Sequence, residues 1–133
     1  MIRKIDATVL FVQDLDRSLA FYRDTLKLPM QGRDPNSVTF VLEGRYFLLL
    51  KVSAAADLLG VEVSALQSVG APRVLLAAGV DDVDAAYNEL MAQGVTLLRS
   101  PIDQPWGLRT AHFADPEGNI WEINQPIVAK TTE

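Results

Sequence analysis

The chain has 133 residues, a length typical of one compact domain. It contains no cysteine, which excludes disulfides, thiolate nucleophiles and cysteine metal sites and fits a cytoplasmic protein. The formal net charge is −5 and no Lys/Arg cluster appears, which argues against a nucleic-acid partner. No apolar run approaches the roughly 20 residues of a membrane span, and the first residues lack the apolar core of a signal peptide.

The first half of the chain predicts a strand, a helix and three more strands. Residues 5–13 are typical of a buried strand, and Asp14 is a candidate N-cap for the periodic stretch that follows. Pro29 is expected to end that helix. The apolar stripe of the helix is Leu15, Leu19, Tyr22 and Leu26, and the strands are Met30–Arg33, the weakest signal, then Ser37–Leu42 and Arg45–Val52, joined by a tight Glu43-Gly44 turn.

Residues 53–70 are rich in Ala and Ser and carry no clean period, so they predict a linker with one helical turn. The pattern then restarts with a strand at 72–80 and a helix capped by Asp81 or Asp82 and stopped by Gly94. The helix stripe is Val83, Ala86, Tyr87, Leu90 and Met91, a short strand follows at 95–98, and the tail from 127 to 133 is expected to fray.

The stretch Pro105–Gln125 predicts a β-hairpin. LRTAHFA alternates as a strand does, DPEGN supplies turn chemistry, and IWEIN forms the second strand. Alternation places Glu122 on the sheet face opposite Trp121 and Ile123. If those two side chains pack in the core, the carboxylate looks out of the other face, which is either plain solvent or a binding cleft.

The order strand–helix–strand–strand–strand therefore occurs twice, and an internal duplication changes the expected fold. Each half is a sheet with one face covered by a helix and the other face free. The prediction is an α+β single domain over residues 1–133, with module one at about 3–52, a linker at about 53–70 and module two at about 72–127. The free faces of two such modules, from one chain or from two, would curve into a trough.

Two motifs carry a resemblance to a known family. The stretches V-x-D-L-x-R-S-L-x-F-Y (12–22) and D-P-x-G-N-x-x-E-I (115–123), with the duplication, resemble the vicinal oxygen chelate superfamily. That superfamily includes glyoxalase I, extradiol dioxygenases and bleomycin-resistance proteins. The stretch P-W-G-x-R looks most like the bleomycin-resistance branch. The resemblance implies tandem βαβββ modules forming a curved mixed sheet with helices on its convex face.

In enzymes of this superfamily a divalent metal is held by the first and last strands of each module. The matching positions in this chain are Ala7, Leu48, Leu75 and Glu122, of which only the last offers a donor atom. A hard divalent ion needs several N or O donors to replace its water. The sequence therefore predicts no bound metal and no other cofactor, and it leaves the catalytic residues unknown.

Nine residues are candidates for ligand binding, each weighed against a structural role. Glu122 is either a solvated relic or a carboxylate that meets a ligand cation or Arg109. His112 is either a half-buried strand residue or a general acid–base, although no orienting carboxylate is obvious in the sequence. Trp106 either stacks on a planar ligand or packs at a dimer interface, and Arg109 either fixes the hairpin or clamps an anion. The remaining candidates line the expected trough: Ala7, Val9, Phe11, Leu48 and Leu75, with Phe40 as a further possibility.

The sequence thus favours a metal-free small-molecule-binding protein over an enzyme. The ligand would be apolar or aromatic, with a cationic group allowed, and sequestration of an antibiotic is one version of this function. A homodimer is expected, because a sheet covered on one side exposes a large apolar face. The alternative is a divalent-metal-dependent lyase, isomerase or dioxygenase with a relocated site, and a third reading is a plain interaction domain.

Overall fold

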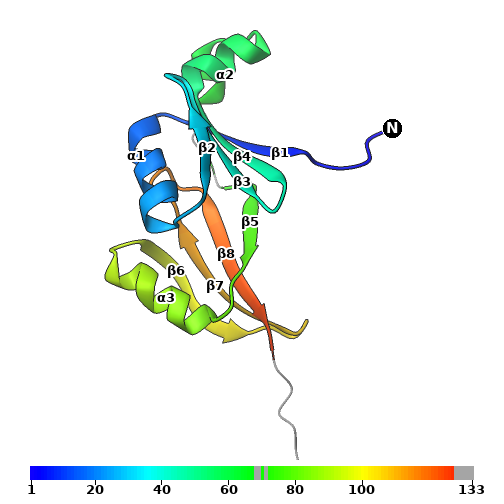
Figure 1. Cartoon of the computed structure of the whole chain (residues 1–133), viewed down its shortest axis with the longest axis vertical. Helices are drawn as coiled ribbons and strands as arrows, with labels where there is room; N and C mark the ends of the chain where they lie inside the picture. Colours follow the sequence, from blue (N-terminus) through cyan, green and yellow to red (C-terminus); the bar gives the residue numbers. More distant parts are fainter. Residues whose placement is uncertain (68–69, 71, 128–133) are drawn as a thin grey trace, which may run out of the picture. The chain divides into compact units, whose positions relative to one another are not determined.

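The computed structural model describes residues 1–67, 70 and 72–127. The chain divides into two compact units, Met1–Gly70 and Ala71–Glu133, each built on a four-stranded mixed sheet. The fold is α+β, and the strand–helix–strand–strand–strand order predicted for each half is confirmed (Figure 1). Among the described residues no helix is both long and apolar enough to span a bilayer.

The first unit has the strand order β1-β4-β3-β2, with β1 parallel to β4 and the other pairs antiparallel. Its helix starts where the sequence predicts, because the Asp14 Oδ1 accepts the Arg17 N–H at 3.0 Å. The elements are β1 (Ala7–Val12), α1 (Leu15–Ala20), the π-helical turn η1 (Phe21–Thr25), β2 (Met30–Arg33), β3 (Ser37–Leu42), β4 (Arg45–Lys51), α2 (Val52–Leu59) and the 3-10 turn η2 (Val63–Leu66).

An aromatic cluster fixes the helix of the first unit to its sheet. Tyr22 is fully buried, with ring centroids 5.1 Å from Phe47 and 6.3 Å from Phe40. Phe40 and Phe47 are cross-strand partners, so alternation sends both rings to the helix side. Phe40 therefore belongs to the core and does not line the opposite face, so of its two alternatives the structural role is the one observed.

The segment predicted as a linker with one helical turn contains a longer helix. α2 contacts β1 and β4 and buries Val52, Ala55 and Ala56. Gly60 ends it in the left-handed conformation, at φ 69°, which glycine adopts without a Cβ penalty. These three buried residues stand at the helical spacing i, i+3 and i+4, and their packing on the sheet stabilises a helix longer than the single turn predicted.

The second unit repeats the topology with strand order β5-β8-β7-β6, and β5 is parallel to β8. Asp82 caps the helix, since its Oδ1 accepts the Ala85 N–H at 3.1 Å. α3 lies along β6, β7 and β8 (Figure 1). The elements are β5 (Leu75–Gly79), α3 (Val83–Ala92), β6 (Thr96–Asp103), which is longer than predicted, β7 (Leu108–Ala114) and β8 (Ile120–Pro126). Of the tail predicted to fray, residues 128–133 lie outside the described residues.

The turn between β7 and β8 is organised by one buried carboxylate. Asp115 is 4% exposed, and its Oδ1 accepts the backbone N–H groups of Glu117 and Asn119 at 2.9 and 2.8 Å. Its Oδ2 accepts the Asn119 side-chain amide at 2.7 Å. Gly118 follows at φ 87°. These contacts close the turn and thereby set the register in which Ala114 pairs with Ile120.

Arg109 ties the helix of the second unit to its hairpin. Its guanidinium donates to both oxygens of Asp84 at 2.8 and 2.9 Å, and to Asp103 at 3.0 Å. These hydrogen bonds raise the pKa of Arg109 and lower the pKa of the Asp84 carboxyl below its usual value. A bidentate pair of this geometry fixes α3 against β6 and β7.

We expect Asp115→Ala to destabilise the protein by about 3 kcal/mol, because three donors in a half-buried turn lose a charged acceptor. Chemical denaturation followed by fluorescence measures the change. Asp57→Ala is the matched control, since Asp57 is exposed on α2, and it should change stability by less than about 0.5 kcal/mol. Equal effects of the two substitutions would contradict the assigned role of the turn.

We expect Arg109→Gln to flatten the acid side of the stability profile. The pKa of Asp84 is lowered in the folded state, so its contribution is present above the unfolded value of about 3.9 and is lost as pH falls through the folded pKa. The melting temperature should fall more between pH 7 and pH 3 in the parent protein than in the variant. Arg45→Gln, on an exposed arginine, is the control and should leave the profile unchanged.

Candidate functional site

The second sheet packs one face on α3, and among the described residues of its own unit no helix covers the other face. Trp121 and Ile123 are each 6% exposed on the packed side, where the Trp121 ring stacks on Phe113 at 6.3 Å between centroids. Glu122 lies between them in sequence and so points to the other face, which confirms the predicted alternation. Its side chain is nevertheless only 15% exposed, which is inconsistent with a freely solvated carboxylate.

Glu122 is the centre of a three-residue cluster on that face. Its Oε1 lies 2.9 Å from the Nε2 of His112, which is its cross-strand partner. Its Oε2 accepts the side-chain N–H of Asn124 at 2.9 Å, from two residues along the same strand. We call His112, Glu122 and Asn124 the acceptor cluster. Both carboxylate oxygens are therefore occupied, and the histidine has the orienting carboxylate that the sequence did not reveal.

Hydrocarbon side chains border the acceptor cluster on one side, on the neighbouring strand β5. Ala77 of β5 pairs in register with Glu122, and Leu75 pairs with Ile120. Leu75 is 48% exposed on this face. A partly buried carboxylate bordered by aliphatic side chains is a common arrangement in small-molecule sites, where a few polar groups fix the orientation of an apolar ligand.

The first sheet also has an uncovered apolar face. Val9 and Phe11 of β1 are each 40% exposed, and Val9 pairs in register with Leu48 of β4. Ala7 lies on the same parity of β1 and is exposed. The predicted lining residues of module one therefore share one face, opposite the face that packs on α1.

Trp106 and Arg109 do not join Glu122. Trp106 lies on the loop between β6 and β7 and is 66% exposed. Arg109 shares its strand parity with Ala111 and Phe113, which face α3, and it is engaged by Asp84 and Asp103. The pairing of Arg109 with Glu122 considered from the sequence is wrong, and its reading as a residue that fixes the hairpin agrees with the geometry.

The residues at the positions that the resemblance assigns to metal ligands offer few donor atoms. Ala7, Leu48 and Leu75 have no donor atom. Among residues 1–67, 70 and 72–127, no group of three or more His, Asp or Glu side chains lies in a ligating arrangement. A catalytic divalent metal site commonly has at least three protein ligands besides water, whereas Glu122 and His112 supply two.

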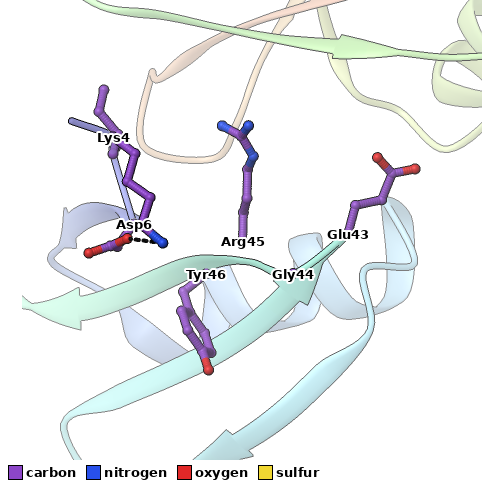
Figure 2. A pocket seen from close by; sticks show the side chains of 7 residues that line it. Lys4, Asp6, Glu43, Gly44, Arg45 and Tyr46 are labelled. Atoms are coloured by element: carbon purple, nitrogen blue, oxygen red, sulfur yellow. Dashed lines mark ion pairs between the residues drawn. The ribbon is translucent and has the colours of Figure 1, made fainter.

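One surface pocket of the described residues lies elsewhere, at the tight turn between β3 and β4. It measures about 460 Å³ and is lined by Lys4, Ile5, Asp6, Glu43, Gly44, Arg45 and Tyr46. Figure 2 shows Arg45 and Tyr46 leaving β4 on opposite sides and Lys4 paired with Asp6. Two cations and two anions line it, so its charge selects for neither sign. A second pocket of about 360 Å³ borders Arg109, and neither pocket contains Glu122.

The sequence reasoning missed the contact of His112 with Glu122 and the role of Asn124. Both were open to inference from the hairpin. Ala114 and Ile120 flank the DPEGN turn, so the residues two positions farther out, His112 and Glu122, must face each other. Asn124 lies two residues beyond Glu122, and period-2 alternation puts it on the same face.

Known proteins match this chain over most of its length. Residues 4–123 match the family described as the Glyoxalase/Bleomycin resistance protein/Dioxygenase superfamily. The uncharacterized protein YraH of Bacillus subtilis is 35% identical over 118 residues, covering 86% of this chain and 91% of YraH.

Solved structures agree with this match. A glyoxalase/bleomycin resistance protein/dioxygenase from Nocardioides superposes with a TM-score of 0.80 at 26% identity, covering all of this chain and 89% of that one. Lactoylglutathione lyase from Agrobacterium tumefaciens has a TM-score of 0.72 at 25% identity, covering 93% and 94%. The chain belongs to the glyoxalase/bleomycin resistance protein/dioxygenase superfamily, the group also called vicinal oxygen chelate proteins.

Proposed function

We propose that this protein is a metal-free small-molecule-binding member of its superfamily. The proposal rests on the side chains at three positions that the resemblance assigns to metal ligands. These residues are Ala7, Leu48 and Leu75, whose hydrocarbon side chains have no donor atom. The one remaining carboxylate, Glu122, is occupied by His112 and Asn124. A surface built in this way can bind a ligand, but its donor set is too small to hold the metal ion on which the superfamily's enzymes depend.

The ligand class follows from what the uncovered sheet faces offer. Val9, Phe11 and Leu75 present 40 to 48% of their surface, which favours an apolar or aromatic body. Glu122 and the net charge of −5 favour a cationic group on that body. A planar cationic antibiotic of the bleomycin type has these properties, and sequestration of such a compound is the resistance version of the proposal.

We expect Phe11→Ser to weaken ligand binding about tenfold, since the ring would contribute about 1.5 kcal/mol of burial against the ligand. Isothermal calorimetry with bleomycin and other planar cationic compounds measures the affinities at low salt. Leu58→Ser is the matched control, because Leu58 is 73% exposed on α2. No heat with any compound would refute the sequestering function, and equal loss in both variants would refute the assigned surface.

We also propose a homodimer, because exposed apolar side chains on both uncovered faces are unusual in a soluble monomer. Light scattering coupled to gel filtration should give twice the mass of one chain, independent of dilution through the micromolar range. Elution as a monomer throughout that range would contradict this assembly.

The rival function is a divalent-metal-dependent lyase, isomerase or dioxygenase. The observation in its favour is the 2.9 Å contact between His112 and Glu122, which brings two donor-bearing side chains together. Elemental analysis of the purified protein separates the two functions. A stoichiometric divalent metal that is lost in Glu122→Gln would favour the enzyme, whereas a metal-free protein that still binds ligand would favour the binding function.

A further inference from the structure

The acceptor cluster has a fixed hydrogen-bond polarity. An ionised carboxylate accepts hydrogen bonds and donates none. The Glu122 oxygens therefore require a hydrogen on each group that they contact, at 2.9 Å from both His112 and Asn124. The nitrogen of His112 that faces Glu122 must therefore carry a hydrogen, and Asn124 must turn its NH₂ group, not its oxygen, toward the carboxylate.

The two neighbours are consequently left with acceptor atoms for anything that binds beside them. His112 directs its Nε2–H to Glu122, so Nδ1 is a bare acceptor whenever the imidazole carries a single proton. Asn124 directs its NH₂ group to the carboxylate, so its Oδ1 is the remaining acceptor. The Oδ1 lies 4.0 Å from the position that a Cβ on Gly79 would take, so glycine leaves the space beside it open.

We propose that the acceptor cluster selects ligands that carry N–H or O–H donors next to their aromatic body. This inference rests on the proposed binding function and adds the polar group that the ligand must present. The contacting atoms would be Nδ1 of His112 and Oδ1 of Asn124, with the charge of Glu122 behind them. Arg99 is an exposed cation that pairs in register with His112. If Arg99 determined the selectivity, the surface would prefer anionic ligands with acceptor atoms, which is the opposite of the preference proposed here.

Three probes of similar size distinguish the effect of hydrogen-bond donors on the ligand from the effects of its charge and of ring stacking. Benzamidinium is planar and cationic with N–H donors, 1-methylpyridinium is planar and cationic without them, and benzoate has the shape of benzamidinium with acceptors in place of donors. Calorimetry or ligand-observed NMR at pH 8.5 should show benzamidinium binding at least tenfold more tightly than 1-methylpyridinium, and benzoate binding more weakly than either. Replacing all three residues of the acceptor cluster, in His112→Phe/Glu122→Leu/Asn124→Leu, should abolish the preference between the two cations, because loss of His112 alone would also free a Glu122 oxygen as an acceptor.

The chain contains one histidine, so its imidazole nitrogens are assigned without ambiguity in a ¹⁵N spectrum. At the same pH, Nε2 should carry the proton and Nδ1 should have the shift of a bare nitrogen that moves when benzamidinium is added. A proton on Nδ1, equal affinities for the two cations, or tighter binding of benzoate would overturn the inference and leave the proposed function standing. Failure of these probes and of every larger aromatic compound to bind would overturn both.

Discussion

The candidate site depends on the hydrogen bonds that the Asp115 carboxylate accepts in the turn between β7 and β8. This carboxylate holds two backbone amides and one side-chain amide of the turn, and the turn sets the register of β7 against β8. A slip of one residue would send Glu122 to the α3 side and Trp121 to the open side. The meeting of His112 with Glu122 is therefore a consequence of a turn at the end of the hairpin, several residues away from either side chain.

The same division of labour is present in both units. In each sheet, one parity of residues packs against a helix, as Phe47 and Trp121 do, and the other parity carries the candidate binding surface. Charged contacts such as that of Arg109 with Asp84 lie on the helix side and hold the architecture. The glyoxalase-like fold thus keeps its structural interactions and its candidate site on opposite faces of a sheet.

Much of this architecture could be predicted from the sequence, because strong local signals determined it. The caps at Asp14 and Asp82 and the alternation around Glu122 gave element types and faces correctly. α2 was missed although its buried residues Val52, Ala55 and Ala56 stand at the helical spacing i, i+3 and i+4, because further Ala and Leu residues around them obscure that spacing. Arg109 was considered as a partner of Glu122 because its charge suited the carboxylate, whereas its strand parity, shared with Ala111, already placed it on the other face. Whether any of the nine candidate residues binds a ligand stays a prediction.

The separation of the two faces has a consequence for how such proteins diversify. Exchanging a histidine or glutamate for Ala7, Leu48 or Leu75 changes the chemistry of the open surface without touching the side chains that fill the interior. A metal-binding relative and a hydrocarbon-lined relative can therefore share the same packed core. Substitutions that change the chemistry of the open face leave the packed core intact, so proteins with this fold can differ in activity while keeping the same architecture.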